Sequence, residues 1–102
     1  MNLKFGDKVD VDLKEFSEDV RIRIYSNIFD LENNPLPDNS YVIRLLDGSE
    51  IQCLKLQEED RNSNLNHRVT YDIKEDKYIR IYGIFDRNPG YKNIKEETKS
   101  RM

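Results

Sequence analysis

Apolar residues alternate with charged residues in short segments of this chain, and this spacing constrains its secondary structure more than any other feature. In residues 8–13, and again in residues 20–25, every second residue is apolar. A β-strand turns successive side chains to opposite faces, so this spacing is typical of a strand with one buried face. The pattern predicts a strand at both places.

Composition and turn signals extend this interpretation. The chain has no alanine, the best helix former, but it has ten Ile, five Val and six Tyr, which suit a pleated surface. Asp47-Gly48-Ser49 is a strong hairpin signal, and Lys74-Glu75-Asp76 reads as a second tight turn. Together these features predict six strands and no long helix: residues 8–13, 20–25, 41–46, 50–56, 67–73 and 77–85.

Two stretches of the chain contain similar words in the same order. Residues 9–35 and 69–89 share V-x-x-D-[LI]-K-E, I-R-I-Y, I-F-D and N-P, which indicates an internal duplication. A half of roughly 50 residues cannot bury an adequate core alone, so we expect the halves to pack about a pseudo-twofold axis. The predicted fold is all-β, a small barrel or sandwich. The repeat boundaries stay open, because the words and the chain order pair the strands differently.

The length of 102 residues suits one domain. We expect a β domain over residues 1–89 and a C-terminal tail over residues 90–102, frayed or forming a short, weakly docked helix. No apolar run approaches the ~20 residues of a membrane span, and the first residues lack a signal-peptide core. With a single cysteine, the chain is expected in the cytoplasm.

Residues for catalysis or metal binding are scarce. His67 is the only histidine and Cys53 the only cysteine, and neither lies in a sequence pattern that builds a nucleophile or a metal site. We therefore expect no catalytic residue, no metal, no cofactor and no enzymatic activity.

Charge argues against a nucleic-acid partner. The tail carries four basic and two acidic residues, which leaves 13 basic against 18 acidic residues in the rest of the chain. An acidic body repels phosphates unless its charges are strongly segregated. The alternative that stays open is a small barrel that binds single-stranded nucleic acid through exposed Arg and Tyr side chains.

The repeated words suggest a surface for a partner. If the isoleucines of I-R-I-Y point inward, the Arg and Tyr beside them point outward in both copies, and these residue types are enriched at interfaces. We expect a non-enzymatic interaction module that binds an extended peptide, as an added strand, in the groove between its halves. Phe29 and Phe85 are alternatively core residues, and a homodimer stays open. The predicted partner-binding residues are Arg23, Tyr25, Phe29, Arg80, Tyr82 and Phe85.

In its size, its six short strands, its degenerate duplication and its content of Lys, Asn, Ile and Asp, the chain resembles the small orphan proteins of filamentous viruses that infect hyperthermophilic archaea. These proteins share no common activity. The resemblance therefore implies an intracellular, virus-encoded accessory role and no particular reaction or ligand.

Overall fold

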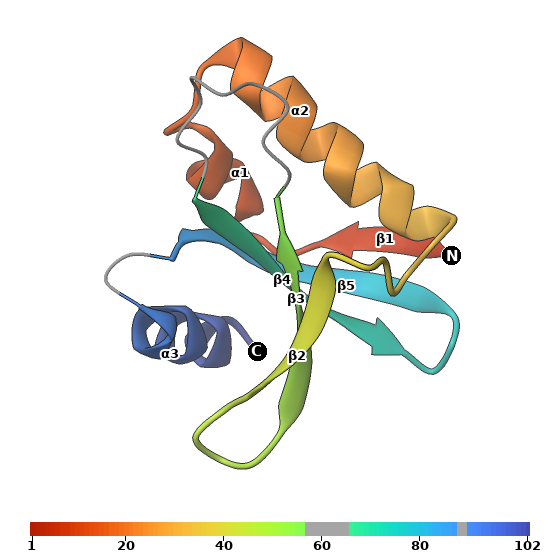
Figure 1. The fold of residues 1–102 in the computed structure, drawn as a ribbon, viewed down its shortest axis with the longest axis vertical. Helices are drawn as coiled ribbons and strands as arrows, with labels where there is room; N and C mark the ends of the chain where they lie inside the picture. The colour runs from red at the N-terminus through yellow and green to blue at the C-terminus, as the bar shows by residue number, and fades with distance from the viewer. Residues whose placement is uncertain (57–65, 88–89) are drawn as a thin grey trace.

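The computed structural model of the chain describes residues 1–56, 66–87 and 90–102. Within them, the strands form one five-stranded sheet in the order β1-β5-β4-β3-β2. Helices α1 and α2 cover one face of the sheet and α3 lies against the other (Figure 1). The elements are β1 (Asn2–Phe5), α1 (Val9–Leu13), α2 (Glu18–Phe29), the 3-10 turn η1 (Asp30–Glu32), β2 (Ser40–Arg44), β3 (Glu50–Lys55), β4 (His67–Lys74), β5 (Tyr78–Asp86) and α3 (Tyr91–Arg101).

The predicted all-β fold of six strands is wrong, because the first two expected strands are helical. Of residues 8–13, all but the first form α1, and residues 20–25 lie within α2. The buried residues of α2 are Ile24 and Ile28, four positions apart, as one face of a helix requires. Ile22, which the strand pattern placed on the same face as Ile24, is 60% exposed.

The internal duplication is also wrong. The word I-R-I-Y is helical at residues 22–25 and extended at residues 79–82. Two copies that differ in secondary structure cannot be related by a pseudo-twofold axis, so neither a barrel nor a sandwich of two similar halves forms. Residues 88–89, the end of the second repeat, lie outside the described residues.

The two predicted hairpins are present. β2 pairs with β3 around Asp47-Gly48-Ser49, where the Asp47 carboxylate accepts hydrogen bonds from the Ser49 amide and hydroxyl. β4 pairs with β5 around a turn in which Glu75 and Asp76 have φ of 54° and 56°. Two successive residues with positive φ are the signature of a type I′ hairpin turn.

The N-terminal strand completes the sheet at its far edge. β1 pairs in parallel with β5, with Leu3 opposite Ile79, and the Gly6 amide continues the ladder to the Ile81 carbonyl at 2.8 Å. Parallel strands need a long crossover connection, and here the crossover contains everything from α1 to β4. The other strand pairs are antiparallel, so the sheet is mixed. The first and last strands of the sequence, β1 and β5, are neighbours in it.

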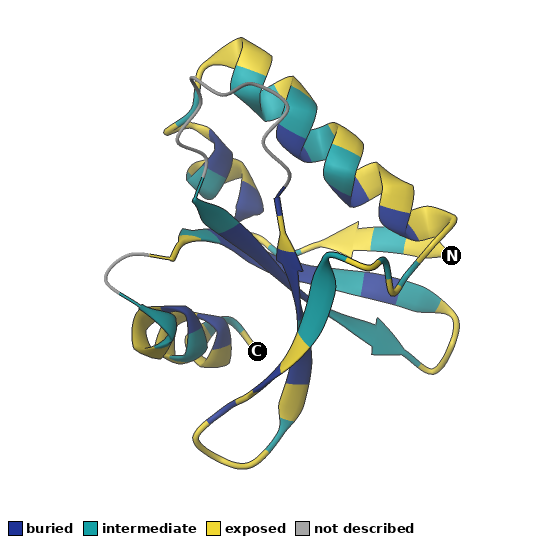
Figure 2. Cartoon of the chain, in the orientation of Figure 1, coloured by how far each residue is buried: buried dark blue, intermediate teal, exposed yellow. Residues whose placement is uncertain are grey.

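Two apolar cores lie on the two faces of the sheet (Figure 2). The larger one packs α1 and α2 against the sheet and contains Ile24, Tyr71 and Ile81, all fully buried. The smaller one packs α3 against the other face, with Ile94 and Thr98 of α3 buried. The tail, expected either to fray or to form a short, weakly docked helix, therefore forms the helix that covers the second face. No described helix has the length and apolarity needed to cross a membrane.

Candidate functional site

A group of hydrogen-bonded side chains lies where β2 and β4 meet the first residue of α3. The hydroxyls of Tyr41 and Tyr91 are 2.6 Å apart, and Arg68 Nε donates to the Tyr41 hydroxyl at 3.0 Å. Arg87 stands over the Tyr91 ring at 5.4 Å from its centroid. We call Tyr41, Arg68, Arg87 and Tyr91 the Arg–Tyr cluster.

Strand register explains how the cluster forms. Tyr41 of β2 lies opposite Cys53 of β3, and Lys55 of β3 lies opposite Arg68 of β4. Residues directly opposite each other project from the same face of a sheet, here the α3 face. α3 then begins at Tyr91, whose hydroxyl lies against the tyrosine on β2. Lys55, directly opposite Arg68, adds a third basic residue on this face.

Arg68 is buried in an unusual way. It is 6% exposed, and within the described residues it forms no ion pair with a carboxylate. Its guanidinium donates instead to the Tyr41 hydroxyl and to the His67 carbonyl. Buried charges are normally paired, so a buried guanidinium that contacts only neutral groups in the described part of the chain is suited to receive an anion.

The two tyrosines of the cluster differ in acidity. Burial raises the pKa of Tyr41 well above its usual value, and its hydrogen bonds to Cys53 and Tyr91 act in the same direction. The pKa of Tyr91 is lowered: burial alone would raise it, but its hydrogen bond to Tyr41 and the nearby Arg87 and Arg68 outweigh that effect. The Tyr41 oxygen accepts from Arg68 and Cys53, which leaves its own proton to donate to Tyr91.

This arrangement has two chemical capabilities. Guanidinium groups recognise the oxygens of a phosphate through parallel N–H donors. A tyrosine of lowered pKa beside them can, in its phenolate form, accept a proton from a reacting hydroxyl. Among the described residues, no three His, Cys, Asp or Glu side chains gather to hold a metal ion.

The six residues predicted to bind a partner are divided between the two faces of the sheet. On α2, Tyr25 stacks on Phe29 with ring centroids 5.8 Å apart, and Tyr25 packs against the larger core. On β5, Tyr82 and Phe85 belong to the smaller core. Their companions Arg23 and Arg80 lie on the same two elements. The predicted groove between two halves is therefore absent; whether these residues contact a partner stays a prediction.

The residues of the Arg–Tyr cluster were not predicted as a site. Fifty residues separate Tyr41 from Tyr91, and 27 separate Tyr41 from Arg68, so no local motif unites them. The one available signal was Arg68 itself, which follows the only histidine in a segment that alternates like a strand.

No family model and no curated protein matches this sequence. Its fold is similar to that of several solved structures. A chain of the archaeal RelE–RelB complex from Pyrococcus horikoshii has a TM-score of 0.66 and 18% identity, covering 87% of this chain and 97% of that chain. The E. coli toxin RelE, as a double arginine-to-alanine mutant in the free state, has a TM-score of 0.66 and 14% identity, covering 99% and 96%. A chain of the toxin–antitoxin complex RelBE2 from Mycobacterium tuberculosis has a TM-score of 0.62 and 17% identity, covering 84% and 96%.

These likenesses correct the functional prediction together with the fold. A peptide-binding module of two all-β halves and a small single-strand-binding barrel are both wrong, because the chain has the mixed α/β fold of the RelE structures. The expectation of a non-enzymatic protein, which rested on the scarcity of residue types for catalysis or metal binding, is contradicted by the likeness to RelE toxin structures.

Proposed function

We propose that this protein is a RelE-type toxin, an endoribonuclease that uses the Arg–Tyr cluster to cleave RNA on the ribosome. RelE-type toxins are ribosome-dependent endoribonucleases. The observation that carries the proposal is the buried guanidinium of Arg68, which lacks a carboxylate partner among the described residues and lies beside two hydrogen-bonded tyrosines. The likeness of the whole fold to RelE structures supports it.

The proposed reaction assigns a role to each side chain. The 2′ hydroxyl of a ribose attacks the adjacent phosphorus, and the Tyr91 phenolate takes its proton while the new O2′–P bond forms. Arg68 and Arg87 stabilise the extra negative charge on the phosphate oxygens, as fixed donors do for a developing oxyanion. The P–O5′ bond breaks, and the departing 5′ oxygen takes a proton from the Lys55 ammonium. The products are a 2′,3′-cyclic phosphate and a 5′ hydroxyl.

The net charge of this chain fits an enzyme that acts on RNA already bound to the ribosome rather than on free RNA. Its formal net charge is −3, so long-range attraction to free RNA is weak. Among the described residues, the basic side chains assigned to the site are those of Lys55, Arg68 and Arg87. A messenger RNA already held by the ribosome reaches such a site without needing a broad basic surface.

The expected protein partner is, on this proposal, an antitoxin. Chains of similar fold have been seen in the RelE–RelB complex and in the intact E. coli RelBE toxin–antitoxin complex. The exposed Lys55 and Arg87 of the site favour a partner with an acidic segment. Acting on ribosomes, the toxin works in the cytoplasm, while an origin in an archaeal filamentous virus stays a prediction that the fold does not test.

The test is cleavage of a messenger RNA bound to purified ribosomes, mapped by primer extension. We expect wild-type protein to cut the bound message and to leave the same RNA intact without ribosomes. Arg68→Gln should lower the cleavage rate by about 100-fold or more, as loss of one oxyanion donor does. Tyr91→Phe, which removes a single oxygen from a half-buried side chain, tests the site without a buried charge being lost.

Arg23→Gln is the matched control, since Arg23 lies on α2, outside the Arg–Tyr cluster, and its carbonyl accepts a hydrogen bond from the Asn27 side chain. It should cleave like wild type. Absence of ribosome-dependent cleavage by folded wild-type protein would refute the proposal, as would full activity in both site variants.

A further inference from the structure

The end of α3 is tied to α1 by a buried ion pair that reaches across the sheet. Arg101 donates two parallel hydrogen bonds to the Asp12 carboxylate, at 2.6 Å and 3.0 Å, and both side chains are 12% exposed. The same carboxylate accepts the amide of Ile84 on β5 at 3.0 Å. Arg101 also donates to the Tyr82 carbonyl at 3.2 Å, so the pair joins three elements.

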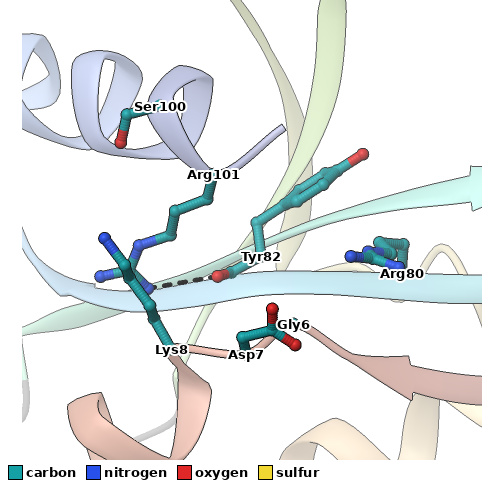
Figure 3. A pocket seen from close by; sticks show the side chains of 7 residues that line it. All are labelled: Gly6, Asp7, Lys8, Arg80, Tyr82, Ser100 and Arg101. Carbon is teal, nitrogen blue, oxygen red and sulfur yellow. Dashed lines mark hydrogen bonds between the residues drawn. The ribbon is translucent and has the colours of Figure 1, made fainter.

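β5 is shaped to admit this arginine. The Arg101 guanidinium lies over the Phe85 ring, 4.6 Å from its centroid. A Cβ atom on Gly83 would overlap both the Arg101 guanidinium and the Phe85 ring, so glycine leaves the slot open. Figure 3 shows Arg101 extending from α3 to β5 along the wall of a pocket of about 210 Å³, with Lys8 and Tyr82 beside it.

α3 carries functional and anchoring residues at opposite ends. Tyr91 is its first residue and Arg101 its last, about 15 Å apart in an α-helix. Between them, Ile94 is fully buried and the Thr98 hydroxyl donates to the Thr70 hydroxyl at 3.0 Å. Ile94 and Thr98 hold the helix against the sheet, but an apolar contact and a single hydroxyl leave some freedom to slide or rotate.

A two-pronged ion pair restricts that freedom. The guanidinium fork accepts a carboxylate in one plane and one orientation, whereas an apolar contact of similar area tolerates small displacements. Buried ion pairs are often no more stabilising than apolar replacements, and their best-attested use is to fix register. Arg101 and Asp12 therefore suit a positional role.

We propose that the Arg101–Asp12 pair is a positioning device for the site: it fixes the rotation and register of α3, and thereby holds the Tyr91 hydroxyl against Tyr41 and beside Arg68. The inference rests on the proposed function in assigning Tyr91 to catalysis. Arg101 itself contacts no residue of the Arg–Tyr cluster in any described hydrogen bond, so its effect on the reaction runs through the helix.

The first measurement needs no activity. Tyrosine is labelled with ¹³C at its ring ε carbons, and the Tyr91 resonance, assigned with Tyr91→Phe, is followed through a pH titration. In wild type, we expect Tyr91 to lose its proton at a lower pH than a free tyrosine, whose pKa is about 10. In Arg101→Gln and in Asp12→Asn, we expect the Tyr91 signal to shift and its titration to move to higher pH, while circular dichroism remains that of the wild type.

The second measurement is ribosome-bound cleavage. A displacement of about 1 Å in a reacting group lowers rates by up to about 100-fold, so kcat should fall by about 10- to 100-fold in both variants with KM little changed. Arg101→Lys retains one contact to Asp12 and should recover part of the loss. Lys99→Gln is the matched control: it removes an exposed ion pair to Asp47 from the same end of α3 and should alter neither measurement.

The outcomes separate the two proposals. If wild type does not cleave, the function fails, but the Tyr91 titration still tests the positioning. If Arg101→Gln and Asp12→Asn are folded and their Tyr91 titration equals that of the wild type, the positioning role is overturned whatever the activity. If Arg101→Gln alone fails to fold, Asp12→Asn, which keeps the shape of the pair, decides.

Discussion

Arg68, which is buried, and Arg101, which is mostly buried, have opposite surroundings, and this difference assigns their roles. The Arg101 guanidinium donates two hydrogen bonds to the Asp12 carboxylate, so its charge is paired within the fold. Arg68 meets a phenol and a backbone carbonyl, so its charge remains available to an incoming anion. Sequence alone does not distinguish them, because each is an arginine with one polar and one apolar neighbour.

His67 allows a prediction about pH. Its ring packs edge-on against Phe16 at 4.7 Å, and within the described residues its buried Nδ1 has no hydrogen-bond partner. Burial lowers its pKa, despite the opposing charges of Asp86 and Glu15. In the unfolded chain, a histidine titrates near pH 6.5.

Because protonation is harder in the folded state, the stability from neutral His67 is fully present above about pH 6.5 and is lost as the pH falls through the lowered folded pKa. Urea midpoints measured from pH 8 to pH 5 should therefore decline at the acidic end. In His67→Gln, which cannot titrate, that part of the decline should be absent; parallel profiles for the two proteins would contradict the argument.

Among the secondary-structure elements, α2 shows why local patterns mislead. Residues 20–25 satisfy a strand pattern through Val20, Ile22 and Ile24, but Ile24 and Ile28 also satisfy a helix pattern. Six residues cannot separate the two periods. The acidic first turn at Glu18 and Asp19 and the spacing that continues to Ile28 favour a helix, but only over a longer window.

The two isoleucines of I-R-I-Y in α2 offer a matched test. Ile24 is fully buried and Ile22 is 60% exposed. Ile24→Ala should lower the free energy of unfolding by about 2–5 kcal/mol, as for other buried isoleucines, while Ile22→Ala should change it by no more than about 0.5 kcal/mol. Chemical denaturation of the two variants checks this. Equal losses would indicate that both side chains share a buried face, as in a strand.

The hairpins were predictable because their signals are local. Asp47-Gly48 and Glu75-Asp76 place residues suited to tight turns between β-rich segments, and turn chemistry acts within four residues. β1 had no such signal: it has four residues and pairs with a strand more than seventy positions away. The cluster of Tyr41, Arg68 and Tyr91 was not predicted for the same reason: its residues are far apart in the sequence and come together only in the folded protein.

For the molecule as a whole, the parallel β1–β5 pairing is the contact that closes the sheet. Removing residues 1–5 takes away the ladder along β5 and the half-buried Leu3 that packs on the larger core. The free energy of unfolding should fall by about 2–4 kcal/mol, from the lost Leu3 and Phe5 side chains, the latter in edge contact with Tyr25 and Phe29, and from the lost ladder. Asn2→Ala, which keeps the backbone, is the control in urea unfolding. An unchanged midpoint for the shortened chain would show that β1 contributes nothing.

The order in which this sheet is assembled has a consequence for protein synthesis. β1 is made first, yet its hydrogen-bonding partner begins at Tyr78, and Tyr91 is made later than Tyr41 and Arg68. A nascent chain that ends before Tyr78 therefore has no closed sheet, and one that ends before Tyr91 has no complete site. On the proposed function, a translating ribosome is exposed to no active toxin from its own unfinished product.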